Sequence, residues 1–341
     1  MSFVVVKSGL LTTIQDNGRL GLRKHGVITS GPMDRFAHRT ANLLVGNTVN
    51  TASMELTLQG AELHAQKDML LALCGADMEA VLDGQPVPLW RPFVIQSGSV
   101  LRMHYAVQGC RVYLAVAGGF DVEPVMGSRS TYMRAGLGGF EGRALQQGDI
   151  LSVGAAEPNG ARMFQAIGKR GASEGQGLLQ APWLVYTGRN SDYEDHPVVR
   201  IVRGREAAWF TAESMEELLA GSYEVTPHSD RMGYRLGGGE LKLGNGFSSE
   251  MISDAVAQGT IQVPPSGQPI LLMADCQTTG GYPRIGQVIS ADLPLVAQIK
   301  PGGRIRFREV SLREAQEELL LQEGDLRMLQ AGVHAWLRDR G

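Results

Sequence analysis

One ten-residue stretch, Asp275–Arg284, gathers most of the groups that could act on a carbonyl substrate. It follows the apolar run Pro269–Ala274, which predicts a strand that ends in polar side chains. Backbone N–H groups beside a double glycine at such a strand end can stabilise a developing oxyanion. The amide of Gln277 and the phenol of Tyr282 could orient the carbonyl. The alternatives are a β-hairpin that turns at the two glycines and, less favoured, Cys276 as a nucleophile, because a small buried thiol is commoner.

A second cluster places an imidazole, a carboxylate and two guanidiniums within eight residues, from His228 to Arg235. On a strand, His228 and Asp230 would face the same side, because side chains alternate. The pair could then act as an oriented general base. The alternative is a structural ion pair between Asp230 and Arg231, and Ser229 as a nucleophile is less favoured than either.

Two further polar segments contain glycines and could contact a ligand. Thr12–Arg19, followed by Gly31–Asp34, offers an amide, carboxylates and a guanidinium where the backbone can approach closely. The alternative is a capped turn in which Asp16 accepts hydrogen bonds from local N–H groups. Gly127–Thr131 places three hydroxyls around an arginine, and could hold an anion or form a surface loop.

Several chemistries are absent from the sequence. It has no Gx4GK[ST] phosphate loop, no HExxH or paired CxxC zinc pattern, no GxSxG elbow and no Met-Lys-Met biotin site. No metal site is therefore predicted, and this chain is not expected to carry biotin. Gly136–Gly142 resembles a dinucleotide fingerprint loosely, but Arg143–Asp149 after it reads as strand and turn rather than as an opening helix, which argues against a Rossmann site.

Composition narrows the class of protein further. The formal net charge is −3, which argues against a nucleic-acid partner. Three cysteines without a CxxC pair favour reduced thiols in a cytoplasm. No apolar run approaches the ~18 residues of a membrane-spanning helix, and the start reads as a strand rather than a signal peptide. We therefore expect a soluble cytoplasmic protein.

The elements that must position these groups are mainly β-strands. Glycine makes up 44 of 341 residues, which suggests many turns between short strands. Apolar or alternating runs bounded by turn residues predict strands at Val4–Val6, Met69–Leu73, Phe93–Ile95, Val100–Met103, Val112–Ala117, Val198–Val202, Ile270–Met273 and Arg304–Phe307.

Helical patterns are fewer. Pro32–Val45 predicts a helix capped by Ser30, and Glu206–Leu219 a second helix that ends at Gly221. A capping box, Ser311–Glu314, opens a helical tail that we expect to break at Gly324 and to resume to about Arg338. Its modest length favours a docked helix over a coiled coil.

A weak internal repeat suggests two related lobes. Gln59–Leu63 followed by Met69–Leu73 is echoed by Gln258–Gln262 followed by Ile270–Ala274. Two more echoes are present, one of them downstream in the same order. The polar stretch Gly188–Pro197 is the predicted boundary, which gives lobes at 1–195 and 196–341, the second with a helical tail at 311–339.

Taken together, these clusters resemble one protein family. The motifs that carry the resemblance are Gly18-Arg19, Ser30–Asp34, Ala41–Asn47, Glu55–Leu58, Gly127–Thr131, His228–Leu236, Gly259–Pro264 and Gln277–Pro283. In this order they are similar to the KipA family, also called the biotin-dependent carboxyltransferase or allophanate hydrolase subunit 2 family. The resemblance runs from about Gly9 to about Phe307.

The resemblance implies a fold and an activity. The fold is mainly β with a few helices: tandem cyclophilin-like β-barrel lobes plus a C-terminal helical tail. The activity is that of one component of a multi-subunit ATP-dependent 5-oxoprolinase, which opens the lactam of 5-oxoproline to L-glutamate. Its partners there are a KipI-like protein (PxpB) and a LamB/YcsF-like protein (PxpA). ATP would be used by the complex, bound on another of its proteins or at an interface. The alternatives are carboxyl transfer from carboxybiotin to urea or a similar amide, and a non-catalytic KipA-like antagonist of a KipI-like kinase inhibitor.

The residues expected to act in that site come from all four clusters. The catalytic candidates are His228, Asp230, Arg231, Gln277 and Tyr282. The substrate-binding candidates are Gln15, Asp16, Arg19, Asp34, Arg129, Gln262, Thr278, Thr279, Gly280, Gly281 and Arg284. Arginines would hold the substrate carboxylate, and Gln277, Thr278 and the Gly280–Gly281 backbone the tetrahedral oxygen.

Overall fold

The chain folds into two compact units, and each unit is built from more than one segment of the sequence. The computed structural model describes residues 2–174, 178–185 and 193–338. Unit 1 comprises Met1–Gly18, Asp34–Asp192 and Gly324–Gly341, and unit 2 comprises Arg19–Met33 and Tyr193–Glu323. The predicted boundary at 188–197 falls partly on residues 188–192, which lie outside the described residues.

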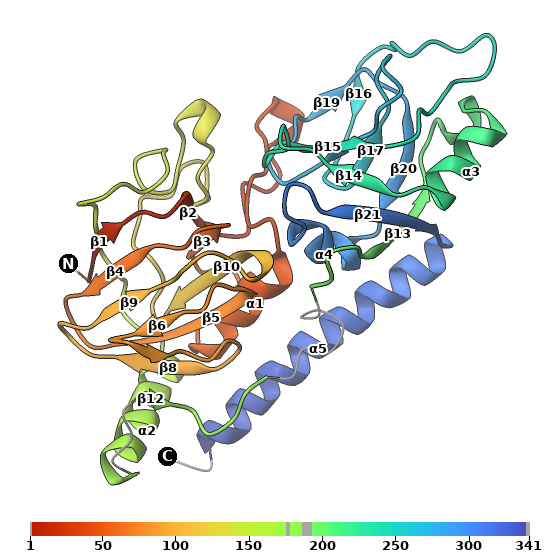
Figure 1. The fold of residues 1–341 in the computed structure, drawn as a ribbon. Helices are drawn as coiled ribbons and strands as arrows, with labels where there is room; N and C mark the ends of the chain where they lie inside the picture. The colour runs from red at the N-terminus through yellow and green to blue at the C-terminus, as the bar shows by residue number, and fades with distance from the viewer. Residues whose placement is uncertain (1, 175–177, 186–192, 339–341) are drawn as a thin grey trace. The chain divides into compact units, whose positions relative to one another are not determined.

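Unit 1 is built from two six-stranded sheets (Figure 1). The first has the order β11 (Ile150–Leu151), β1 (Phe3–Lys7), β4 (Glu62–Ala65), β9 (Val100–Arg102), β6 (Val81–Leu82) and β7 (Gln85–Pro86). The second has the order β12 (Leu179–Gln180), β8 (Pro92–Ile95), β5 (Met69–Asp77), β10 (Gln108–Val116), β3 (Ser53–Thr57) and β2 (Leu11–Gln15).

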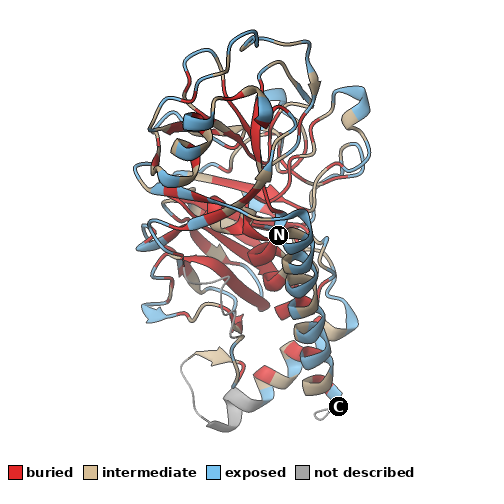
Figure 2. Cartoon of the chain, turned by 90° about the vertical axis from the view of Figure 1, so that its right-hand side faces the viewer, coloured by how far each residue is buried: buried red, intermediate tan, exposed pale blue. Residues whose placement is uncertain are grey.

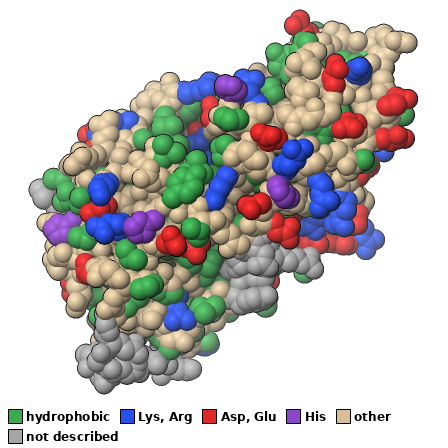
Figure 3. Space-filling view, viewed as in Figure 1, with side chains coloured by type: hydrophobic (Ala, Val, Ile, Leu, Met, Phe, Trp, Pro, Cys, Tyr) green, Lys and Arg blue, Asp and Glu red, His purple; other side chains and the backbone are tan. Residues whose placement is uncertain are grey.

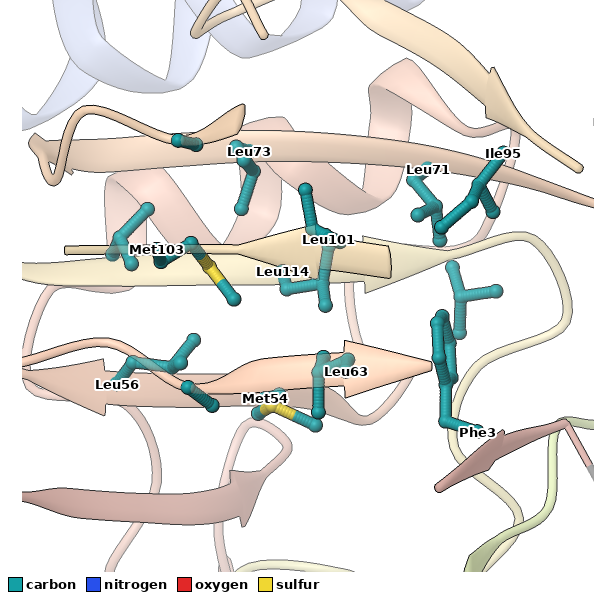
Figure 4. Close-up of a cluster of buried hydrophobic side chains, with 14 of the residues drawn as sticks. Phe3, Met54, Leu56, Leu63, Leu71, Leu73, Ile95, Leu101, Met103 and Leu114 are labelled. Atoms are coloured by element: carbon teal, nitrogen blue, oxygen red, sulfur yellow. The ribbon is translucent and has the colours of Figure 1, made fainter. Parts of the chain in front are cut away.

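The main core of unit 1 lies between these sheets. Figure 4 shows Met54, Leu56 and Leu114 from the second sheet meeting Leu63 and Leu101 from the first. Every second residue of a strand faces this core, because side chains alternate along an extended backbone. The intervening residues of β3 and β10 therefore face the other side of their sheet.

That other side is covered by helix α1 (Arg35–Leu44), which contacts β5 and β10. The predicted helix is present, but it begins later than Pro32, and its cap is Asp34 rather than Ser30. The Asp34 carboxylate accepts a hydrogen bond from the N–H of Ala37 at 2.9 Å. Ser30 instead has a left-handed backbone conformation, with φ of 56°, outside the helix.

Unit 1 also contains a helix that the sequence patterns did not predict, α2 (Pro158–Glu174). Only Met163 and Ile167 of its described large apolar side chains are buried, and Gly160 packs against Gly46 so tightly that a Cβ on Gly46 would lie 2.4 Å from the nitrogen of Gly160. Its buried face is thus partly glycine, which a search for an apolar stripe does not detect.

Unit 2 is a closed seven-stranded barrel around a second apolar core. Around the barrel the strands are β13 (Val198–Arg203), β20 (Arg284–Val288), β17 (Thr260–Gln262), β18 (Ile270–Leu272), β15 (Gly233–Gly237), β14 (Tyr223–Val225) and β21 (Arg304–Glu309). A separate two-stranded ribbon pairs β16 (Asp254–Ala255) with β19 (Thr279–Gly280). Helices α3 (Ala212–Ala220) and α4 (Leu293–Ala297) complete this unit. The helix predicted at Glu206–Leu219 is divided, because Thr211 caps α3 by accepting from the N–H of Ser214.

The tail is one helix, α5 (Leu312–Arg338), and the predicted break at Gly324 is wrong. A glycine inside a helix costs only about 1 kcal/mol relative to alanine, and Leu326, Val333 and Leu337 are buried beyond it. The capping box is confirmed, since the Ser311 N–H donates to Glu314 at 2.7 Å and the Glu314 N–H donates to the Ser311 hydroxyl. Figure 2 shows that one side of this helix is largely exposed.

The chain is thus mainly β, with two β-rich lobes and a C-terminal helix, as predicted. Each of the eight predicted strands coincides with an observed strand to within a few residues. None of the described helices is both long enough and apolar enough to cross a membrane.

Candidate functional site

The ribbon β16–β19 of unit 2 carries the residues that the sequence marked as most chemically active. Asp254 pairs with Gly280, and Ala255 with Thr279. Beyond these pairs, the N–H of Val256 donates to the Thr278 carbonyl at 3.2 Å. Gly280 therefore belongs to strand β19 and Gly281 directly follows it. The alternative of a hairpin turn at these glycines is wrong.

Gln262 lies directly beside this ribbon. Its side-chain amide is buried and donates from Nε2 to the Tyr282 carbonyl at 3.2 Å. A Cβ on Gly280 would lie 2.5 Å from the same Nε2 atom, so a larger residue at this position would require the Gln262 side chain to shift. The Tyr282 side chain is 37% exposed, and Gln277 and Thr278 are half-buried. The structure therefore brings Gln262 and the predicted stretch Gln277–Tyr282 together, with part of it open to solvent.

Arg284, predicted to bind substrate, is already occupied by two carboxylates. Its guanidinium donates to both oxygens of Glu206 at 2.6 Å and to Asp254 at 3.0 Å, and its Nη1 donates to the Ala255 carbonyl. The hydrogen bonds to Glu206 raise the pKa of Arg284 above its usual value. Burial alone would raise the pKa of Glu206, but the Arg284 hydrogen bonds outweigh it and lower that pKa. Arg284 thus anchors strand β16, and sequence analysis missed Glu206 because it lies 78 residues away.

Arg231 is paired with Asp275. Its Nε and Nη2 donate to the two Asp275 oxygens at 2.9 and 3.1 Å, and Nη2 also donates to the Gly31 carbonyl at 2.6 Å. The side chains are only 5% and 7% exposed. The Asp230 carboxylate accepts the N–H groups of Met232 and Gly233, which closes a local turn.

The expectation that His228 and Asp230 lie on one strand is wrong. Both lie on the connection between β14 and β15, where His228 and Asp230 are exposed. The geometric argument for an oriented imidazole–carboxylate pair therefore does not apply, because strand alternation does not hold in a turn. A proline at position 227 and the Asp230 turn account for the interruption.

A segment from the N-terminal part of the sequence also contacts this region of unit 2. Arg23, in the single-turn helix η1 (Arg23–His25), donates from Nη2 to the carbonyls of Val256 and Gln277 at 2.5 and 3.0 Å. Arg19 of the same segment is 1% exposed, and its N–H donates to the Thr29 carbonyl. Sequence analysis missed Arg23, since no local pattern distinguishes it from its neighbours.

In unit 1 the structure brings Asp16 of the predicted segment Thr12–Arg19 together with the predicted segment Gly127–Thr131. One Asp16 oxygen accepts from the Gly18 N–H and from the hydroxyls of Ser128 and Ser130 at 2.9, 2.5 and 2.7 Å. The other accepts from the Arg129 N–H at 2.6 Å. Burial acts to raise the pKa of Asp16, but these four donors hold it below its usual value. The capped-turn interpretation of Asp16 therefore holds, with the cap provided across 112 residues as well as locally.

Gln15 differs from Asp16 in keeping one polar atom without a partner. The Nε2 atom donates to the Thr13 hydroxyl and to the Thr131 carbonyl at 3.0 and 3.3 Å, which fixes the amide orientation because a carbonyl can only accept. Its Oε1 atom is buried and has no hydrogen-bond partner among the residues described. Arg129 donates from Nε to the Val122 carbonyl.

A row of polar side chains is buried between α1 and the second sheet of unit 1. Glu55 and Tyr113 are cross-strand partners, and the Tyr113 hydroxyl donates to Glu55 at 2.7 Å. The same hydroxyl accepts the N–H of Asp34 at 2.7 Å. Burial raises the pKa of Tyr113 well above its usual value and lowers that of His38 to about 4. Asp34, predicted to bind substrate, therefore caps α1 and lies in this row, whereas Tyr113 and His38 had no predicted role.

The predicted site residues are thus divided between the two units. Gln15, Asp16, Asp34 and Arg129 belong to unit 1, and the others belong to unit 2. Within the described ranges, no group of three or more His, Cys, Asp or Glu side chains could hold a metal ion. Figure 3 shows acidic and basic side chains interspersed over the face in view.

Comparisons with known proteins agree with this architecture. The family model "Carboxyltransferase domain, subdomain A and B" matches residues 25–309. The chain is 40% identical over 311 residues to the C component of 5-oxoprolinase from Escherichia coli (strain K12), which covers 91% of this chain and 92% of that protein. It is 31% identical over 325 residues to urea amidolyase of Saccharomyces cerevisiae, covering 91% of this chain and 17% of that protein. The crystal structure of Kluyveromyces lactis urea carboxylase matches with a TM-score of 0.82 and 27% identity, over 97% of this chain and 29% of that one.

Proposed function

Because the chain belongs to the family of carboxyltransferase domains with subdomains A and B, we propose that it acts as the C component of an ATP-dependent 5-oxoprolinase. Such an enzyme hydrolyses the lactam of 5-oxoproline to L-glutamate. The observation that carries this proposal is the match to the E. coli C component, which spans nearly the full length of both chains. The urea amidolyase match, in contrast, covers less than a fifth of that longer protein.

We assign the chemistry within unit 2 to the ribbon and its surroundings. The backbone of Gly280 and Gly281, with Gln277 and Thr278, would stabilise the oxygen that becomes negative when the lactam carbonyl is attacked. Support comes from the partial exposure of this stretch and from the close approach of Gly280 to the side-chain amide of Gln262. Tyr282 would contact the substrate.

Arg231 and Arg284 of unit 2 support the site rather than bind the substrate carboxylate. Arg231 and Arg284 have their charges matched by Asp275 and by Glu206 with Asp254. A guanidinium held by two hydrogen bonds to one carboxylate has few donors left for a ligand. His228 and Asp230, on their turn, are the proposed proton carriers.

We place the chain in a complex with the KipI-like protein PxpB and the LamB/YcsF-like protein PxpA. A five-membered lactam is stable, so its hydrolysis needs coupling to ATP. The sequence has no phosphate loop, and we therefore propose that ATP binds on another protein of the complex or at an interface.

The test is reconstitution. The chain is mixed with its two partner proteins, and glutamate released from 5-oxoproline is measured with and without ATP while each protein is omitted in turn. We expect ATP-dependent glutamate that disappears without this chain. Turnover that is unchanged without it, or a well-formed complex that releases no glutamate, contradicts the proposal.

A second candidate function is carboxyl transfer, which the overall similarity to urea carboxylase favours. It requires a biotin carboxylase and a biotin carrier, because this chain has no Met-Lys-Met attachment site. Transfer of labelled carboxyl from carboxybiotin to urea by the same preparation would support it. A stable complex with the KipI-like partner and no turnover of either kind would instead indicate a binding role.

A further inference from the structure

The two-stranded ribbon β16–β19 is too short to be stable without further contacts. Each strand contributes two residues, and two-stranded structures of this size are marginal in water without further contacts. The main-chain bonds that extend it, from Val256 N–H to Thr278 and from Met251 N–H to Gly281, add one link on each side. Its geometry must therefore depend on side chains that contact it.

Three arginines supply such contacts from different parts of unit 2, and one of them, Arg205, donates to the Asp254 carboxylate of β16 at 2.6 Å. Arg284 holds β16, through the Ala255 carbonyl and the Asp254 carboxylate. Arg23 contacts both legs of the ribbon at one end, through the carbonyls of Val256 and Gln277. Arg23 thus links the leg that leads into Thr278–Tyr282 to the opposite leg, at the end where Gln277 begins this stretch.

The chemistry of this contact requires a guanidinium. One planar group with several N–H donors can satisfy two carbonyl oxygens on neighbouring strands, whereas an ammonium is a compact point charge with a less fixed geometry. Within the described residues Arg23 forms no ion pair, so its hydrogen bonds to these two carbonyls hold the main chain itself. The adjacent Cys276 thiol is buried, which raises its pKa, and the nearby Arg23 acts in the opposite direction.

We propose that Arg23 is a positioning residue that fixes the stretch Gln277–Tyr282, so that the segment Arg19–Met33 completes the candidate site of unit 2. The catalytic consequence rests on the proposed function. Backbone donors that must meet a developing oxyanion tolerate little displacement, and an error of about 1 Å can lower the rate on the order of 100-fold. Loss of Arg23 should thus reduce kcat more than it changes KM.

The experiment compares Arg23→Gln and Arg23→Lys with a matched control, Lys24→Gln, which removes a charge from the same single-turn helix. Lys24 is exposed, and no hydrogen bond or ion pair of its side chain occurs among the described residues. The first readout is amide hydrogen exchange of the full chain over residues 277–282, compared with β17 and β18. The second is kcat and KM for 5-oxoproline in the reconstituted complex.

For Arg23→Gln we expect exchange about tenfold faster over 277–282 and unchanged exchange in β17 and β18, because a lost charged hydrogen bond is equivalent to at least that factor. We expect kcat to fall about tenfold or more with KM within about threefold. Arg23→Lys should recover part of the protection from exchange and part of kcat. Lys24→Gln should show the same exchange and the same kcat as the original protein.

Exchange over 277–282 that stays unchanged in Arg23→Gln overturns the proposal. Equal acceleration in β17 and β18 also overturns it, since Arg23 would then only stabilise the barrel. If the unchanged complex releases no glutamate, the proposed function fails, but the exchange comparison still decides the role of Arg23.

Discussion

The buried pair Arg231–Asp275 allows a sharp test of how unit 2 is held together. Replacement Asp275→Asn keeps the shape of the side chain but removes its charge. Arg231 would then keep its buried position, with its side chain 5% exposed, but would lose the charge of the carboxylate to which it makes two hydrogen bonds. Breaking a buried pair from one side costs about 3–5 kcal/mol, because the remaining charge is poorly solvated. We expect this loss in the unfolding free energy of unit 2.

The assay must report on unit 2 separately, since a chain of two units need not unfold in one step. Hydrogen exchange of β17 and β18 against urea provides this. With a slope of about 2 kcal/mol per molar urea, the midpoint should fall by roughly 1.5–2.5 M. The matched control is Asp230→Asn, which changes the carboxylate adjacent to Arg231 in sequence but on a turn that is partly open to solvent, and it should cost less than about 1 kcal/mol.

A double variant, Arg231→Met with Asp275→Leu, separates charge from packing. Replacing a buried pair by apolar residues is often nearly neutral, but Arg231 also donates to the Gly31 carbonyl. We therefore expect the unfolding free energy of the double variant to be within about 2 kcal/mol of that of the original protein and higher than that of Asp275→Asn. The reasoning is refuted if Asp230→Asn destabilises unit 2 as much as Asp275→Asn does.

Three further predictions concern other buried contacts. The pKa of His38 is lowered to about 4 by burial, below the ~6.5 of an unfolded chain. The contribution of His38 to the free energy of unfolding is therefore fully present above pH ~6.5. It falls by about 3 kcal/mol as the pH drops to ~4, because the unfolded chain then binds a proton that the folded protein does not. An imidazole NMR titration near pH ~6.5 would contradict this. Asp16→Ala removes the acceptor of four hydrogen bonds and should destabilise unit 1 by about 2–4 kcal/mol in thermal unfolding; a loss under about 1 kcal/mol would argue against it. Thr211→Ala removes the cap of α3 and should cost about 1 kcal/mol, with Thr211→Ser nearly neutral as the control, and equal losses would exclude a capping role.

The strands were predictable because their signals are local. Runs such as Met69–Leu73 and Val112–Ala117 are apolar and end at turn residues, and each lies within an observed strand or extends one residue past it. Helix α2 was not predictable in this way, because Gly160 takes the place of an apolar side chain in its contact with Gly46. The break predicted in α5 was wrong for the opposite reason, because a local signal was present but was outweighed. Burial of Leu326 and Val333 stabilises the helix although Gly324 has a poor helix propensity.

The candidate site was only partly predictable, because its ion pairs join distant residues. The stretch Gln277–Tyr282 does form a partly exposed polar edge beside a strand, as its pattern predicted. The carboxylate for Arg231 lies 44 residues away, however, although an aspartate directly precedes it. The carboxylate that accepts both hydrogen bonds from Arg231 is therefore one that no local pattern could associate with it. Arg23 is separated from Gln277 by 254 residues, and no local pattern could associate them.

The division of the chain also determines how relatives can be recombined. Because Arg19–Met33 belongs to unit 2 while the residues on both sides of it belong to unit 1, a chimaera joined only at residue 193 exchanges an incomplete module. It would combine the Gly31 and Arg23 of one parent with the Arg231, Val256 and Gln277 of the other. A functional exchange of the second module must therefore transplant two separate stretches of the gene, and these contacts define a compatibility requirement between them.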